Sequence, residues 1–423
     1  MKKLNSIIKL KSQRGGATAL VFFTLFVFLI IASGVFMTSS TLRKSQAKSD
    51  IQIQEIYGKD VKDVDSVYEE LVEANKSELE KLKDTSEYVT ETKTITDKYK
   101  NKVVIPQGFK VASDSGLNVT EGIVIEDNDI KEGIGNNRGN QYVWVPVGDI
   151  IKSDGTKTTI TLGRYTFADG INDKASDGTT VLEKGTAILK QSAENYTQEV
   201  LINSYYKELA SSRIGAVDTN NHLNDTNTTA LNLKEFVDSV KANGGYYIAR
   251  YEASYGTDGK ANSKTSNTFT NSDAESTTRT EGKLWNYITQ IDAAKACYNI
   301  YEDSYTNATT DLINSYAWDT AIVYIQIFSG DTDYSYQDGP SINSSLTNTG
   351  ANKDEKCKIN DMASNCFEWT TEYSIYINGP DAYPCTRRGG NYYYSSSGVN
   401  IRNYYREIYS NGYNTFRSIL YIK

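Results

Sequence analysis

The chain has 423 residues, of which 39% are hydrophobic and 23% are charged, and this ordinary globular composition excludes a wholly disordered chain and a protein with many membrane spans. The net charge is −8 and no basic cluster follows the N-terminus, so nucleic acid is not an expected partner. The length predicts more than one domain.

The first 37 residues predict a membrane anchor. Residues 1–16 form a basic leader without acids, and residues 17–37 carry no charge. As a helix, residues 17–37 would extend about 31 Å, which matches the hydrocarbon core of a bilayer. Because basic flanks stay in the cytoplasm, we expect a single-pass protein of the cell membrane with a cytoplasmic N-terminus and an extracellular C-terminal domain. The alternative is a buried core helix.

The junction at Gly16 resembles the leader of prepilin-type proteins, in which a basic segment ending in Gly precedes an apolar helix. Prepilins usually carry a Glu five residues after the cleavage point, and Val21 occupies that place here. We therefore expect a retained signal anchor rather than cleavage after Gly16.

Residues 38–100 contain one glycine and no proline, and their apolar residues recur at spacings of three and four. This pattern predicts an amphipathic helical stalk. The stalk would hold the rest of the chain off the membrane and offer a surface for self-association.

From residue 101 the chain changes to short β-like runs, turns and isolated helices. We divide it into an N-terminal extension (101–232) and a displayed domain (233–423). The clearest expected strands and helices are 103–111, 122–128, 139–147, 232–242, 282–300 and 311–325. Strands, then helices, then strands predict an α+β fold rather than a regular βα alternation.

Histidine and cysteine are scarce. The single histidine, His222, lies in a polar run typical of an exposed loop, so a metal site with two histidines is excluded. The four cysteines form no Cys-x-x-Cys pair. If the chain is exported, one or two disulfides between them are an alternative.

Six segments occur in the order found in formylglycine-generating enzyme-like (sulfatase-modifying factor) domains. They are GGYYIARYEAS (244–254), KLWNYITQIDAAKACYNIY (283–301), DLINSYAWDTAIVYI (311–325), NDMASNCFEWTTEY (360–373), RRGGNYYYSSS (387–397) and TFRSILYIK (415–423). The chain resembles this family over about 240–423. The resemblance implies a C-type-lectin-like fold, a compact and irregular α+β domain that brings its two ends together and carries long loops.

The catalytic chemistry of that family is not expected here. Its enzymes use two cysteines shortly after the Arg-Gly-Gly motif together with copper, and those places fall near Tyr394 and Val399 in this chain. Because copper(I) needs soft thiolate ligands, we expect no copper, no catalytic residues and no enzyme activity. An oxidase of this class is the alternative.

The resemblance also implies a structural calcium site. The family's ligands correspond to the side chains of Asp361 and Glu368 and to the main-chain carbonyls of Ser364 and Cys366, which are hard oxygen ligands. The alternative is that the two carboxylates only brace a loop.

The C-terminal tail is rich in tyrosine: residues 386–423 hold 8 of the 32 tyrosines. Tyrosine with Ser and Asn is typical of recognition surfaces, and consecutive strand residues such as 392–394 cannot all point inward. The candidate ligand-binding residues are Trp369, Tyr392, Tyr394, Asn400, Arg402, Tyr404, Tyr405, Tyr409 and Tyr413. This placement also resembles the variable proteins of diversity-generating retroelements.

We therefore expect a membrane-anchored extracellular binding protein, adhesin-like or receptor-like, with an unknown protein or carbohydrate partner. A minor pilin or pilus-tip adhesin is a further alternative.

Overall fold

The computed structural model describes residues 72–210, 233–256, 259–266, 279–302, 306–351, 353–379 and 381–423. The chain divides into two units, Met1–Asn75 and Lys76–Lys423. The predicted membrane helix 17–37, most of the predicted stalk and His222 lie outside the described residues. No helix among the residues that are described is long and apolar enough to cross a membrane.

The predicted stalk is wrong near its C-terminal end. Helix α5 (Glu78–Thr85) begins with a capping box between Ser77 and Glu80 and ends at Thr85. The chain then forms strand β1 (Lys93–Thr96), which pairs with β2 (Lys102–Ile105). Buried apolar side chains, Leu79 among them, pack residues 78–105 against the folded body. Packing therefore overrides the helical periodicity that predicted a continuous stalk helix.

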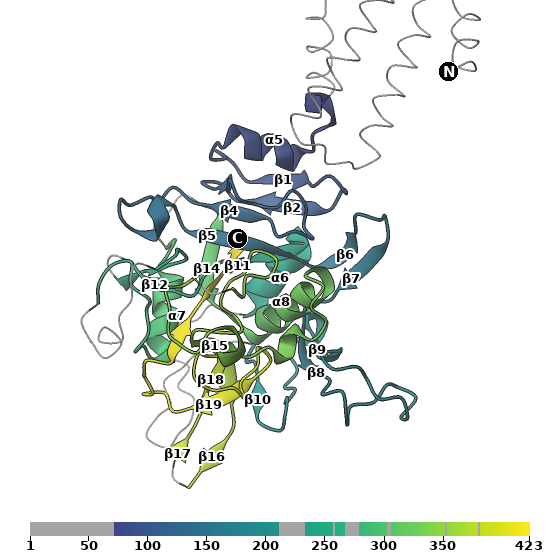
Figure 1. Ribbon diagram of the computed structural model, residues 1–423, viewed down its shortest axis with the longest axis vertical. Helices are drawn as coiled ribbons and strands as arrows, with labels where there is room; N and C mark the ends of the chain where they lie inside the picture. The colour runs from purple at the N-terminus through teal and green to yellow at the C-terminus, as the bar shows by residue number, and fades with distance from the viewer. Residues whose placement is uncertain are drawn as a thin grey trace, which may run out of the picture. The chain divides into compact units, whose positions relative to one another are not determined.

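A six-stranded antiparallel sheet forms the centre of the body (Figure 1). Its order is β14 (Ala308–Leu312), β21 (Ser418–Ile422), β11 (Gly245–Ala249), β5 (Gln141–Pro146), β4 (Val124–Glu126) and β3 (Lys110–Val111). Strands β11 and β21 are the first and the last described strands of the displayed domain, and their pairing brings its two ends together. The mixed α+β class predicted from sequence is confirmed.

The second sheet has five strands and carries the tyrosine-rich tail. Its path is β10 (Tyr206–Lys207), β15 (Phe367–Ser374), β18 (Cys385–Arg388) and β19 (Arg402–Tyr405), and β20 (Asn414–Phe416) runs parallel to β15. Figure 1 shows this sheet at the end of the body opposite β1 and β2.

Three main helices cover the sheets: α6 (Leu233–Asn243), α7 (Gln290–Tyr298) and α8 (Ser315–Phe328). Helix α8 contacts β5 of the first sheet and β15 of the second, and α7 contacts β14 and β15. The predicted helix 311–325 begins later than expected because residues 308–312 form β14 and Asn314 caps α8.

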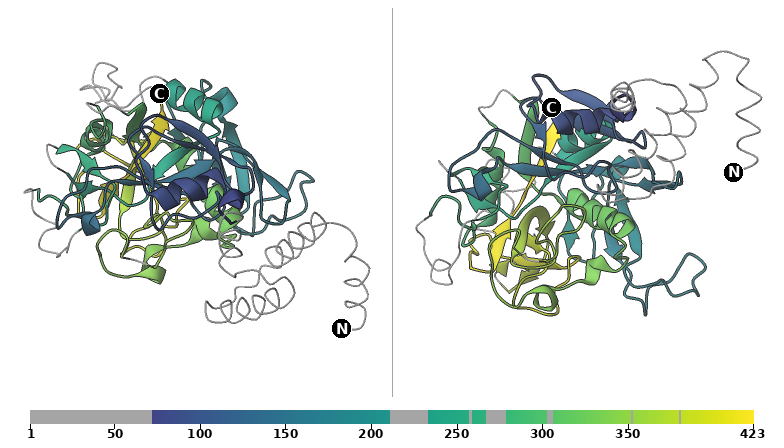
Figure 2. Two further views of the ribbon diagram at one scale, coloured as in Figure 1. Left: turned by 90° about the horizontal axis from the view of Figure 1, so that it is seen from above. Right: turned by 45° about the horizontal axis from the view of Figure 1, so that its top comes forward.

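Smaller elements surround these layers. They are hairpins β6 (Gly148–Ile151) with β7 (Lys157–Ile160), β8 (Gly163–Phe167) with β9 (Ala187–Ser192), β12 (Ser254–Tyr255) with β13 (Ala261–Asn262) and β16 (Ile377–Asn378) with β17 (Asp381–Ala382), helix α9 (Gly339–Ile342) and 3₁₀ turns Gly135–Asn137, Ala193–Asn195 and Tyr334–Tyr336. The connection from β8 to β9 extends from the body, as Figure 1 and the right view of Figure 2 show; we call residues 168–186 the arm.

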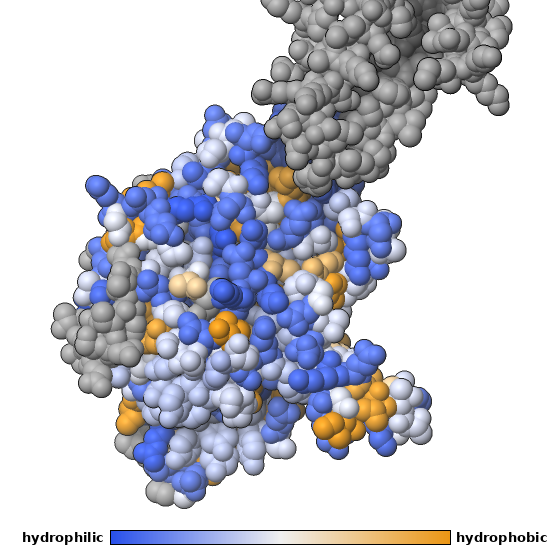
Figure 3. Space-filling model, viewed as in Figure 1, coloured by the Kyte–Doolittle hydropathy of each residue, from blue (hydrophilic) through white to orange (hydrophobic). Residues whose placement is uncertain are grey.

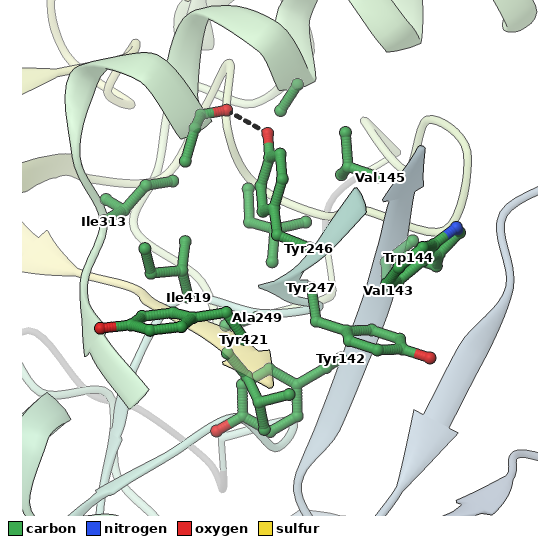
Figure 4. Packing of buried hydrophobic residues seen from close by; sticks show 14 of the residues in the cluster. Tyr142, Val143, Trp144, Val145, Tyr246, Tyr247, Ala249, Ile313, Ile419 and Tyr421 are labelled. Atoms are coloured by element: carbon green, nitrogen blue, oxygen red, sulfur yellow. Dashed lines mark hydrogen bonds between the residues drawn. The ribbon is translucent and has the colours of Figure 1, made fainter. Parts of the chain in front are cut away.

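Tyrosine is a core residue as well as a surface residue. Figure 4 shows Tyr142, Tyr246 and Tyr247 packed among aliphatic side chains of the central sheet. The Tyr246 hydroxyl donates to the carbonyl of Ala317 in α8, and the Tyr247 hydroxyl donates to Val104, at 2.5 and 2.8 Å. The rings of Tyr246 and Tyr247 therefore bury apolar area while their hydroxyls keep hydrogen-bond partners.

A buried ion cluster joins the second sheet to α8 and β8. Glu372 in β15 pairs with Arg164 of β8 at 2.7 Å and with Arg402 of β19 at 3.0 Å. Asp319 in α8 pairs with Arg388 of β18 at 2.6 Å and also with Arg402. All five side chains are essentially inaccessible to water, so each charge depends on its partners.

Two arginines of the cluster also donate to backbone carbonyls. Arg388 Nε donates to the carbonyl of Ile401 at 2.7 Å, and Arg164 donates to the carbonyls of Val200 and Tyr206 at 2.9 and 3.1 Å. The three arginines hold the pKa of Glu372 at about 2, although burial alone would raise it.

We expect Glu372→Gln to lower the free energy of unfolding by about 3 kcal/mol at pH 7, because breaking a buried pair leaves the arginines uncompensated. A lowered folded-state pKa stabilises the fold above pH 4.5, the ordinary value, and that contribution is lost as the pH falls towards 2. Urea titrations of both proteins from pH 7 to pH 3 measure the difference. Glu199→Gln, which removes a surface pair with Lys207, should change stability little. A stability difference that does not vary with pH would contradict this assignment.

Candidate functional site

Strand β19 divides the tail tyrosines between two sides of the second sheet. Successive side chains of a strand point to opposite faces, so Arg402 and Tyr404 share one face and Asn403 and Tyr405 share the other. The contacts agree: Tyr404 meets Tyr206, whereas Tyr405 meets residues of the opposite face. The predicted single surface is therefore two surfaces.

On the side of Tyr405, Arg387 lies between two aromatic rings. Its guanidinium is 3.8 Å from the ring centroid of Phe367 and 4.0 Å from that of Tyr405. It also donates to Asn414 Oδ1 at 2.5 Å and to the Tyr405 hydroxyl at 2.6 Å. Burial lowers the pKa of Arg387 to about 10, and the ring faces offset part of its lost hydration. Tyr405 in turn stacks on Tyr409 at 4.2 Å.

Four further tyrosines adjoin this stack. The ring of Tyr413 lies 5.5, 5.9 and 6.1 Å from those of Tyr392, Tyr393 and Tyr394. Tyr394 also stacks on Phe367 at 6.3 Å, which connects this group to Arg387 and Tyr405. We call Tyr392, Tyr393, Tyr394, Tyr405, Tyr409 and Tyr413 the tyrosine face.

The backbone before the tyrosine face explains its position. Gly390 lies against the carbonyl of Ala363, where a Cβ atom would come within 2.0 Å of the oxygen, so only glycine fits. Asn391 then accepts hydrogen bonds from the backbone N–H groups of Tyr393 and Tyr394 at 3.1 and 2.8 Å. This Asx turn directs the next side chains outward, and Tyr393 and Tyr394 are 63% and 44% exposed.

Tyr404 belongs to a different aromatic group on the other side. Its ring stacks on Tyr376 at 4.0 Å and also contacts Tyr205, Tyr206 and Tyr383. Asn400 lies on this side too, in the lining of a pocket that also includes Tyr404.

Two predicted binding residues are buried, and their assignment to a surface is wrong. Trp369 is fully buried, donates from Nε1 to the carbonyl of Ile288 at 2.9 Å and meets Tyr405 edge-on. Arg402 is held in the ion cluster by Asp319 and Glu372. Both side chains support the surface from below.

The predicted calcium ligands Asp361, Ser364, Cys366 and Glu368 are all buried. Glu368 already has a cationic partner, because Arg417 donates from Nε and Nη2 to its two oxygens at 2.6 and 2.5 Å. A calcium ion bound to Glu368 would have to compete with this guanidinium.

Other groups complete the charge balance near Glu368. Asp361 Oδ2 accepts from the backbone N–H of Gly350 at 2.6 Å. Burial, together with Asp361 and Glu368, raises the pKa of Glu252 well above its usual range, which favours the protonated acid. Within the described part of the chain, no three His, Cys, Asp or Glu side chains gather to hold a metal. Asp361 and Glu368 therefore already have protein partners, and a calcium ion would have to displace them.

All four cysteines are described and are free thiols, so none of them forms a disulfide here. Cys297, Cys366 and Cys385 are buried, and burial raises the pKa of each thiol. At the places of the family's thiol pair, Tyr394 is exposed and Val399 is buried.

Several contributors to these surfaces were missed in the sequence, and most of them lie outside the tail or do not have a tyrosine side chain. They are Tyr205, Tyr206, Phe367, Tyr376, Tyr383 and Arg387, together with Tyr393 of the tail. The adjacent pair at 205–206 was the available signal, since paired tyrosines also mark the tail.

Comparisons with known proteins show only remote likeness. No family model matches the chain, and no curated protein matches it. Among solved structures, "Crystal Structure of CarF" is 15% identical with a TM-score of 0.32 and covers 42% of this chain and 87% of its own. The Major Tropism Determinant P3c variant is 14% identical with a TM-score of 0.29, covering 79% and 87%, and the U1 variant is 13% identical with a TM-score of 0.28, covering 79% and 82%. Likeness at this level assigns neither fold nor function.

We expect the thermal unfolding midpoint of the full-length protein to be the same in calcium and in EDTA. A calcium site filled at 100 times its Kd would add about 2.7 kcal/mol, a shift that calorimetry readily detects. A higher midpoint in calcium that Glu368→Gln abolished would restore the predicted site.

Proposed function

We propose that this protein is an adhesin-like or receptor-like binding protein that recognises an extracellular protein or carbohydrate through the tyrosine face. The observation that carries the proposal is the arrangement of six contiguous tyrosines on a buried, ion-paired scaffold. Tyrosine offers a large contact area with few torsions to restrict, and the polar Ser and Asn residues beside it add hydrogen bonds.

The surface chemistry favours an uncharged contact. Figure 3 shows pale, weakly polar surface around the lower end of the body, where β15, β18 and β19 lie. The positive charge of Arg387 is enclosed by Phe367 and Tyr405. Ring faces and hydroxyl groups, rather than formal charges, are therefore what the tyrosine face presents.

We also propose a C-type-lectin-like assignment for residues 233–423 and a non-catalytic role. The pairing of β11 with β21 and the long irregular segments between α8 and β20 support the fold assignment. The absence of cysteine after Cys385 supports the non-catalytic role, since no thiol pair follows Arg388. A formylglycine-generating oxidase is the alternative, and tight copper(I) binding or oxidation of a cysteine peptide would establish it.

We also propose that a diversity-generating retroelement varies the sequence of the C-terminal tail. Residues 392–396 are half-buried or exposed and consist of Tyr and Ser, whereas Arg388, Asn391 and Arg402 are buried. Surface positions can vary without loss of the ion cluster. A near-identical template repeat and a reverse transcriptase beside the gene are expected, and their absence would end this part of the proposal.

We expect the alanine variant of Tyr392, Tyr394 and Tyr413 to lose most binding to any ligand found on a glycan and surface-protein array. Three exposed or half-buried aromatic contacts are removed while the buried residues stay unchanged. Tyr99→Ala is the matched control, because this tyrosine lies between β1 and β2 at the other end of the body. Wild-type binding by the triple variant, with unchanged thermal stability, would remove the tyrosine face as the site.

For the anchor, we propose that residues 17–37 hold the chain in the cell membrane and that the stalk is a route to self-association. The protein should stay in the membrane fraction after alkaline extraction and retain its leader. N-terminal sequencing of the mature protein checks this, and a chain that begins at Ala17 would favour the minor pilin alternative instead.

A further inference from the structure

A second recess lies on the side of the sheet away from the tyrosine face. It is a pocket of about 720 Å³ between β19 and the segment from β8 to β10. Its lining includes residues of the tail, such as Asn400 and Tyr404, and residues of the N-terminal extension, such as Asp173, Lys190 and Tyr205. Figure 3 shows the surface hollowed between the lower end of the body and the arm. We call this recess the arm pocket.

The aromatic wall of the arm pocket is held in place by ring contacts. Tyr404 stacks on Tyr376 at 4.0 Å and on Tyr206 at 6.3 Å. The Tyr206 hydroxyl donates to the carbonyl of Arg402 at 2.7 Å. Tyr205 meets Tyr404 edge-on at 6.1 Å and is 40% exposed. A ligand would therefore meet preformed ring surfaces.

A tight turn forms the rim. Asn203 and Ser204 both have left-handed backbone conformations, with φ of 49° and 68°. The backbone N–H of Tyr205 donates to the carbonyl of Ile202, and Ile202 also pairs with Tyr206. This conformation is unfavourable for residues other than glycine and asparagine, and it brings Asn203 and Tyr205 to the lining of the pocket.

The polar groups of the lining are balanced in charge. Asp173 and Lys190 carry opposite charges, and the guanidinium of Arg402 is neutralised by Asp319 and Glu372. Asn400 and Asn203 add side-chain amides. A charged ligand would gain little here. A purely apolar ligand would cover these groups without giving them hydrogen bonds, which is unfavourable.

From this lining we infer that the arm pocket binds a neutral carbohydrate of one or two sugar rings. A sugar presents an apolar face of C–H groups, which packs against a tyrosine ring, and an edge of hydroxyl groups, which bond amides and charged side chains. The volume lies within the usual range for small-ligand pockets, about 300–1,000 Å³. The arm pocket goes beyond the proposed function, because it uses the opposite side of the sheet from the tyrosine face.

Saturation-transfer NMR on the full-length protein tests this inference. The probes are glucose, galactose, mannose, N-acetylglucosamine, maltose, lactose and cellobiose. We expect transfer to at least one sugar, and we expect Tyr404→Ala to weaken its affinity about tenfold. Tyr404→Phe, which keeps the ring, should retain most of the affinity for that sugar. Asn203→Gly, which removes the amide of an exposed rim residue and keeps its left-handed backbone, should weaken the affinity as well.

Tyr99→Ala is the matched control, because this tyrosine lies between β1 and β2, outside both surfaces, and its loss should leave sugar affinity unchanged. If the folded wild type shows no transfer from any sugar, the inference is overturned. Loss of sugar binding in Tyr394→Ala, with no loss in Tyr404→Ala or Asn203→Gly, would also overturn it, by placing the sugar on the tyrosine face. The proposed function fails separately, when the tyrosine-face triple variant still binds its array ligand.

Discussion

The buried ion cluster is the constraint on which both surfaces depend. Asp319 and Glu372 come from α8 and β15, and the three arginines that pair with them come from β8, β18 and β19. In an environment without water, an unpaired charge costs several kcal/mol, so these five elements must stay together for any of the charges to be tolerated. The cluster thus joins the N-terminal extension to the tail. It also holds Arg402 at the start of β19, which sets the side to which each later residue of that strand points.

Two recognition surfaces result from that one strand. Tyr405 faces Arg387 and the exposed tyrosines around Tyr413, whereas Tyr404 faces the rings of the arm pocket. The two sides draw on different parts of the chain, since the tyrosine face is built from residues 367–413 and the arm pocket also needs residues 163–206. The extension is therefore a structural part of a candidate site rather than a spacer between the stalk and the displayed domain.

Local pattern was a good guide to elements and a poor guide to exposure. The runs at 139–147 and 232–242 became β5 and α6, because a short apolar run and helical spacing are local signals of a strand and a helix. Trp369 and Arg402 were predicted to lie on the binding surface, yet both are buried. A tryptophan or an arginine in a half-polar strand is compatible with either location, and only its partners decide. For Arg402 those partners are 83 and 30 residues away in sequence.

The sequence by itself determined the composition of the tail, the α+β class and the inability of the residues after Cys385 to supply a thiol pair. These are properties of residue type and local period, which need no knowledge of distant contacts. Only the tertiary structure decided which tyrosines share a surface. It also decided that Arg417 pairs with Glu368 and that residues near 205 line a pocket together with Tyr404. The physical reason is that burial and charge pairing depend on neighbours brought together by sheet register, and no local pattern encodes those neighbours.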